Sequence, residues 1–119
     1  MGEFNTAIKY YQKWIDIDPD YVEPYWCIAE IYNLLELYTK ARDTVLEGLK
    51  HIHRHNNWIE RAEAWREKPW DALAIATFHT GDYDMGIEAS RHALEYNPND
   101  VRILKNYIAI LEKRFLNNN

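Results

Sequence analysis

The stretch Gly81-Asp82-Tyr83-Asp84-Met85-Gly86 decides the fold of this chain, because related stretches precede it twice. They are Glu36-Leu37-Tyr38-Thr39-Lys40-Ala41 and Gly2-Glu3-Phe4-Asn5-Thr6-Ala7. Each has an aromatic residue at its third position and a small residue at its sixth. The sequence numbers are offset by 34 from the first stretch to the second, and by 45 from the second to the third. Such spacing marks a repeated supersecondary unit, and units of this kind stack on one another.

A second series of positions gives the same two offsets. Tyr25, Trp70 and Leu104 are offset by 45 and then by 34. Ala29, Ala74 and Ile108 have the same two offsets. A single insertion, at residues 56–66, reconciles every interval, because its length is the difference between the two offsets. The residues that define the repeat are Gly2, Phe4, Ala7, Pro19, Tyr25, Ala29, Tyr38, Ala41, Trp70, Ala74, Gly81, Tyr83, Gly86 and Pro98.

The unit reads as two short helices joined by a tight turn. The helix expected over residues 25–35 carries its apolar residues at i, i+3, i+4 and i+7, which is one helical face. Asp20 and Glu23 ahead of it predict a capping box. At the turn, Gly81 can adopt the positive φ that ends a helix, and Asp82 is placed to cap the next helix.

The second helix of each unit is rich in small residues, which let two helices approach closely. Pro19 and Pro98 follow these helices and end them, because proline cannot continue a helix. Glu36 and Leu37 stand where the third unit has Gly-Asp. The small residues of the second helices are Ala7, Ala41, Gly48, Gly86, Ser90 and Ala93.

Together these features resemble the tetratricopeptide repeat (TPR). The family's aromatic-leucine-small opening stands at Trp70, Leu73 and Ala74, and its closing Asn-Pro stands at Asn97-Pro98. Its Gly-x-Tyr turn stands at residues 81–83. The resemblance covers nearly the whole chain outside the insertion. It implies an all-α, right-handed solenoid of antiparallel helix pairs, with six or seven helices.

The register treats the chain as one TPR-like domain. Because the first unit begins at its turn, we expect the chain to be a fragment of a longer protein. The insertion carries Trp58 and Trp65 on one face of an expected short helix. Two roles stay open for these residues: filling the gap between units, or lining a ligand or peptide groove. The segments are a half-unit 2–19, a unit 20–55, an insertion 56–66, a unit 67–98 and a terminal helix 99–116.

Composition excludes several classes of function. The net charge of −5 argues against a nucleic-acid binder that works by neutralising phosphates. No apolar run is long enough to span a membrane, so no membrane association is expected. The single Cys27 cannot form an internal disulfide, which favours a reducing compartment, the cytoplasm.

Motifs that could carry chemistry are incomplete. His51 and His55 lie one helical turn apart, but a firm metal site needs three or four ligands. The two D-x-D motifs, at residues 16–18 and 82–84, fall at repeat turns, where aspartate serves capping and solubility. We therefore expect no enzyme activity, no catalytic or metal-binding residues and no cofactor.

Binding is the function that the repeat favours. The TPR resemblance implies a concave face lined by the first helices. Some family members clamp a C-terminal carboxylate there with Lys, Asn and Arg, but Glu23 and Glu30 would repel one. We expect a protein or peptide partner, or another domain of the same polypeptide. The candidate partner-binding residues are Glu23, Trp26, Glu30, Asn33, Lys68, Asp71, Ile75, His79, Arg102 and Lys105.

The last helix suggests a further surface. Over residues 100–115 its apolar stripe is wide for a surface helix. The stripe consists of Val101, Ile103, Leu104, Tyr107, Ile108, Ile110, Leu111 and Phe115. Terminal repeats normally present polar outer faces. Self-association into a homo-oligomer through exposed ends of the solenoid is therefore a second hypothesis.

A narrower resemblance gives an alternative function. Residues 67–74, followed by the turn at 81–83, look like the helical C-terminal tails of bacterial and phage family-2 glycosyltransferases. In those tails a Trp-bearing insert separates the repeats, as Trp58 and Trp65 do here. This resemblance implies an accessory domain of a parent enzyme whose catalytic domain is absent from the chain.

Overall fold

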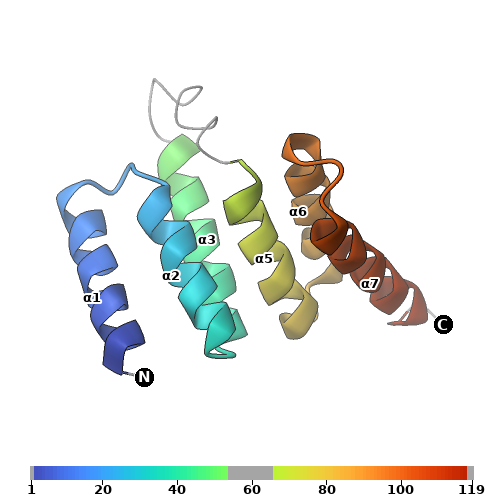
Figure 1. Ribbon diagram of the computed structural model, residues 1–119, viewed down its shortest axis with the longest axis horizontal. Helices are drawn as coiled ribbons and strands as arrows, with labels where there is room; N and C mark the ends of the chain where they lie inside the picture. Colours follow the sequence, from blue (N-terminus) through green and yellow to red (C-terminus); the bar gives the residue numbers. More distant parts are fainter. Residues whose placement is uncertain (1, 54–65, 118–119) are drawn as a thin grey trace.

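The computed structural model describes residues 2–53 and 66–117, and this part of the chain is built from six α-helices (Figure 1). No strand occurs in the described residues. The expected all-α, TPR-like helical solenoid is confirmed. The Trp58 and Trp65 helix falls outside the described residues. The helices are α1 (Gly2–Ile17), α2 (Glu23–Leu34), α3 (Tyr38–His53), α5 (Glu67–Thr80), α6 (Tyr83–Tyr96) and α7 (Val101–Asn117).

The helices alternate between two roles. The first helices of the units are α2, α5 and α7, which face the viewer in Figure 1, with α3 and α6 behind them. Each of the second helices α3 and α6 packs against the first helix of its own unit and against the first helix of the next. Within the described residues, α1 packs only against α2, and α7 packs against α5 and α6. The array therefore has a half-unit at each end.

Close approach within each unit depends on residues with little or no side chain. A methyl group added at Gly48 would lie 2.8 Å from Cγ of Tyr25, across the α2–α3 contact. One added at Gly86 would lie 2.7 Å from Oγ1 of Thr77, across the α5–α6 contact. Ala29 and Ala41 are also fully buried. Small side chains at these positions let the helix backbones meet at the distance that this packing requires.

The two turns between first and second helices have the same geometry. Gly81 has a φ of 87°, and Glu36, its counterpart in the preceding unit, has a φ of 61°. In both turns the amide of the next residue donates to a carbonyl of the first helix: Asp82 to Thr77 at 3.1 Å, and Leu37 to Tyr32 at 2.8 Å. Glu36 thus holds a left-handed conformation that suits glycine.

Two capping predictions were wrong. The capping box predicted from Asp20 and Glu23 would start the helix at Asp20, but α2 begins after Val22, whose side chain makes no cap. Pro24 lies in the first turn of α2 and has no amide group that needs a partner. Asp82 occupies the N-cap position of α6 but makes no side-chain cap. Its carboxylate instead accepts hydrogen bonds of 2.6 Å from Arg42 and from Thr80.

The last helix buries only one of its two apolar sides. Ile103 and Ile110 are buried, whereas Leu104 and Ile108, the counterparts of Trp70 and Ala74, are exposed. Trp70 and Ala74 lie on α5, and α6, the second helix of the same unit, packs against α5. Within the described residues, α7 packs only against the preceding unit.

Gly86→Ala should lower the free energy of unfolding. Alanine is intrinsically favoured over glycine in a helix by about 0.5–1 kcal/mol, but overpacking a tight contact costs about 1–3 kcal/mol. The clash with Thr77 should therefore prevail. Gly2→Ala is the matched control, since nothing lies within 4 Å of a methyl group there. Urea denaturation measures both variants, and a Gly86→Ala protein as stable as the parent would contradict the packing.

Glu36→Gly should raise the free energy of unfolding. Glycine removes the cost of the left-handed conformation, which is roughly 1–2 kcal/mol for an L-residue. The greater chain entropy of glycine in the unfolded state offsets about 0.5–1 kcal/mol of this stabilisation. A net stabilisation of about 0.5–1 kcal/mol is expected in thermal or urea unfolding. Glu88→Gly is the control, because Glu88 is exposed within the helix α6, where glycine should lower the free energy of unfolding.

Candidate functional site

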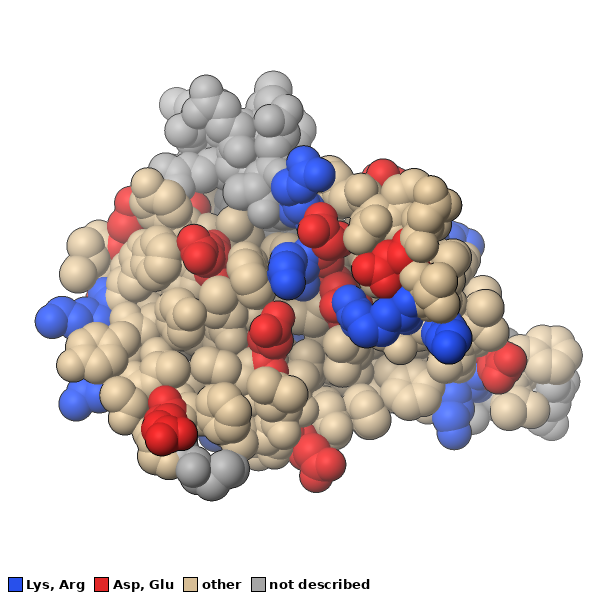
Figure 2. Space-filling view, viewed as in Figure 1, with Lys and Arg blue, Asp and Glu red and all other residues tan. Residues whose placement is uncertain are grey.

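Ten candidate residues line one side of the first helices, and we call this surface the first-helix face. It consists of Glu23, Trp26, Glu30 and Asn33 on α2, Lys68, Asp71, Ile75 and His79 on α5, and Arg102 and Lys105 on α7. Figure 2 shows this side of the molecule, where basic and acidic side chains are interspersed. Trp26, Asn33, Asp71 and Ile75 are half-buried, and the other six are exposed.

Asp71 and Arg102 bind each other across α5 and α7. The guanidinium donates two parallel hydrogen bonds to the carboxylate, from Nη1 to Oδ1 at 3.1 Å and from Nη2 to Oδ2 at 2.7 Å. The bond to Asp71 is also the main cause that raises the pKa of Arg102. Bidentate pairing of this kind holds both planes in place. These two candidates are therefore engaged with each other in the structure.

Asn33 and Lys68 link α2 to α5. The Asn33 side-chain amide donates to the Ala72 carbonyl at 3.0 Å, and its Oδ1 is buried with no hydrogen-bond partner. The Lys68 ammonium lies 5.6 Å from the centre of the Trp26 ring, within the range of a cation–π interaction. An unpaired buried acceptor is unusual, so Oδ1 of Asn33 is suited to a donor from a bound partner.

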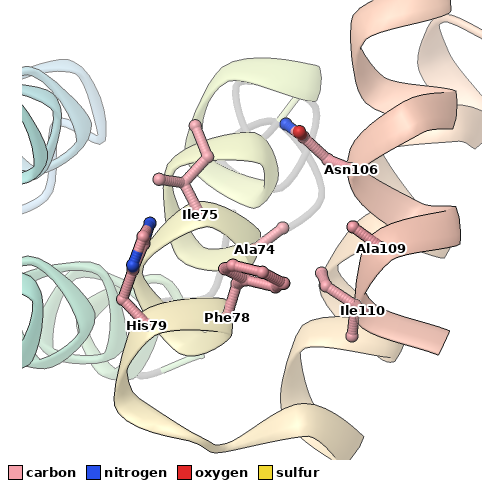
Figure 3. Close-up of a pocket in the computed structure, with 7 residues that line it drawn as sticks. All are labelled: Ala74, Ile75, Phe78, His79, Asn106, Ala109 and Ile110. Atoms are coloured by element: carbon pink, nitrogen blue, oxygen red, sulfur yellow. The ribbon is translucent and has the colours of Figure 1, made fainter. Parts of the chain in front are cut away.

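Two pockets lie on this face, one between each pair of neighbouring first helices. The pocket between α5 and α7 holds about 150 Å³ and is mostly apolar (Figure 3). The pocket between α2 and α5 holds about 190 Å³, and Ile75 contributes to both. The α5–α7 pocket is lined by Ala74, Ile75, Phe78, His79, Asn106, Ala109 and Ile110. The α2–α5 pocket is lined by Glu30, Asn33, Leu34, Asp71, Ala72 and Ile75.

The structure joins only some of the candidates into these pockets. Glu30, Asn33, Asp71, Ile75 and His79 line one or both. The His79 ring stacks on Tyr38 with 3.9 Å between ring centres, which fixes its position at the rim. The remaining five candidates, Glu23, Trp26, Lys68, Arg102 and Lys105, line neither pocket.

Sequence reasoning missed the apolar wall of the α5–α7 pocket. Phe78 points from α5 toward α7, and Asn106 points back from α7 (Figure 3). A signal was present for both, since Phe78 follows Ala74 and Asn106 follows Arg102 by one helical turn. Helical spacing gave no reason to select Ala109, whose small side chain leaves room for the α5–α7 pocket.

The residues considered for chemistry have structural partners. The His51 ring stacks on Tyr25, and its Nε2 lies 3.4 Å from Glu47; His55 falls outside the described residues. Asp84 accepts a 2.7 Å hydrogen bond from Arg114. Burial raises the pKa of the half-buried Cys27 thiol, which makes it a poorer nucleophile.

Two features are absent from the described residues. They contain no group of three or more His, Cys, Asp or Glu side chains placed to hold a metal ion. No described helix combines the length and apolar character needed to cross a membrane.

The comparisons with known proteins agree with this fold. The family model for the tetratricopeptide repeat matches residues 1–21 and 67–100. The chain is 30% identical over 112 residues to the Hsp70-Hsp90 organising protein of Plasmodium falciparum (isolate 3D7). The match covers 94% of this chain and 19% of that protein, so the chain spans about a fifth of its relative. These findings support the tetratricopeptide repeat family, and neither supports the narrower resemblance to glycosyltransferase tails.

The Asp71–Arg102 pair should contribute more to stability than an exposed pair. Exposed ion pairs contribute about 0.2–1 kcal/mol, and bidentate geometry with a mostly covered Asp71 should place this pair at the upper end. A double-mutant cycle with Asp71→Ala and Arg102→Ala measures the coupling energy. Glu88 with Arg91, both largely exposed, serves as the comparison pair. Equal coupling in the two cycles would show that Asp71 and Arg102 are not held together in solution.

Proposed function

We propose that this chain is a non-catalytic module that binds a protein or peptide partner on its first-helix face. The observation that carries the proposal is the pair of neighbouring pockets on one continuous surface, both bordered by Ile75. The repeat family and the relative support a role in protein interaction, because the name of that relative describes a protein that organises two others. The lone, half-buried Cys27 fits the reducing cytoplasm, which we propose as its compartment.

The two pockets differ in what they would accept. The α5–α7 pocket, with Phe78, Ala109 and Ile110 in its lining, suits an aliphatic side chain. The α2–α5 pocket carries the Glu30 carboxylate and the buried, unpaired Oδ1 of Asn33. A hydrogen-bond donor, and above all a basic side chain, would satisfy both groups. A segment that places one basic and one aliphatic residue in adjacent pockets is the partner chemistry that we propose.

A C-terminal carboxylate is a poor match to the same face. Arg102 is engaged by Asp71, and Glu30 stands beside the α2–α5 pocket. An incoming anion would have to displace Asp71 from a bidentate pair, and like charges in proximity are repelled. The proposed partner segment is therefore internal or carries net positive charge.

Selection of short peptides from a random library on the immobilised chain tests this function. Enriched peptides should combine Lys or Arg with an aliphatic residue. Ile75→Lys should weaken their binding by at least about tenfold, which corresponds to about 1.4 kcal/mol, because an ammonium group would then border both pockets and repel the basic side chain of the peptide. Glu95→Lys on the distant helix α6 should leave binding unchanged.

Isothermal titration calorimetry of the selected peptides decides the outcome. Circular dichroism melting first establishes that Ile75→Lys is folded. If no peptide is enriched, or if a folded Ile75→Lys protein binds as tightly as the parent, the first-helix face is not the binding site.

A further inference from the structure

Helix α7 exposes a row of apolar side chains that we call the α7 end face. It consists of Val101, Leu104, Ile108 and Leu111, spaced by three, four and three along one side of the helix. Ile108 is 52% exposed and Val101 is 60% exposed. Ile110, on the side that packs against α6, is 1% exposed. Apolar side chains are therefore present on two sides of α7, and the described chain covers only one.

The complete units show which helix packs on the corresponding face of a first helix. Leu104 is the counterpart of Tyr25 and of Trp70 in the two complete units. Tyr25 lies against Gly48 and stacks on His51, while Trp70 stacks on His92 with 4.2 Å between ring centres. All three partners lie on the second helix of the same unit. The α7 end face thus has the position that a second helix covers in both complete units.

Helix α1 carries the matching surface, which we call the α1 end face: Ala7, Tyr10, Trp14 and Ile17. In the repeat register Trp14 corresponds to Gly48 and Ile17 to His51, while Ala7 corresponds to Gly86. They are therefore the counterparts of residues that contact a first helix. Tyr10 is 66% exposed and Ile17 is 75% exposed. Within the described residues, α1 packs only against α2, so no described helix lies against this face.

We propose that two copies of this chain associate head to tail, with α1 of one copy packed on α7 of the other as its second helix. The contact rebuilds the helix pair that each complete unit contains. Residue sizes are compatible with it: Tyr25 opposes Gly48 in a complete unit, whereas the smaller Leu104 would oppose the larger Trp14. Burial of the α7 end face and of the exposed Tyr10 and Ile17 on α1 would drive the association.

The symmetry of the contact predicts its stoichiometry. The α1 and α7 end faces differ, so the interface is heterologous, and each added copy leaves one face of each kind available. Heterologous contacts that do not close into a ring grow into open chains. Average mass should therefore rise steadily with concentration instead of reaching a plateau at a dimer. This assembly is separate from partner binding, because neither end face includes a residue of the first-helix face.

Sedimentation velocity over a concentration series, from low micromolar to near millimolar, tests the proposal. Ile108→Glu blocks the α7 end face and Ile17→Glu blocks the α1 end face. Both residues are exposed, so the variants should fold, as circular dichroism verifies. Each variant alone should self-associate at least about tenfold more weakly than the parent. An equimolar mixture should form 1:1 dimers that grow no further, because one intact face of each kind remains.

Lys113→Glu, an exposed charge reversal on α7 away from the end face, should associate like the parent. The proposal is overturned if the parent is monomeric throughout the series. It is equally overturned if Ile17→Glu alone still forms dimers, since this would indicate α7 pairing with α7. A mixture of the two blocked variants that stays monomeric would exclude the head-to-tail contact.

Discussion

The close contact between the two helices of a unit is the constraint on which the rest of the structure depends. Gly48 meets Tyr25, and Gly86 meets Thr77, at distances that leave no room for a methyl group. When two helices lie this near, each pair forms a thin layer, and a second helix can reach the first helix of the following unit as well. The stacked array, and the alignment of first helices on one side, follow from this contact.

Arginine residues connect consecutive units through pairs of side chains that lie far apart in the sequence. Arg42 of α3 binds Asp82 at the turn after α5, Arg102 of α7 binds Asp71 of α5, and Arg114 of α7 binds Asp84 of α6. The partners are separated by 40, 31 and 30 residues. Such pairs contribute little energy individually when exposed. Each pair also engages a guanidinium group that would otherwise be available to a ligand anion.

The same stacking produces both surfaces that we propose for binding. Small residues, Ala72 and Ala74 among them, line the pockets between neighbouring first helices. At the ends of the array, stacking leaves one helix face without the neighbour that it has in a complete unit. The proposed partner binding and the proposed self-association would thus both depend on how the helix pairs stack. They use different residues, so selection could act on each independently.

The sequence by itself determined the repeat, the helix pairs and the positions of the small residues. Periodic spacing is a local property, so Gly81, Gly86 and Pro98 could be placed without knowledge of the fold. Only the tertiary structure decided that Asp71 binds Arg102, that Asp82 binds Arg42 in place of capping α6, and which side of α7 is covered. These outcomes depend on distances between residues that lie far apart in the sequence, which no local pattern specifies. The left-handed Glu36 shows the same limit, since its conformation is imposed by the packing of α2 and α3.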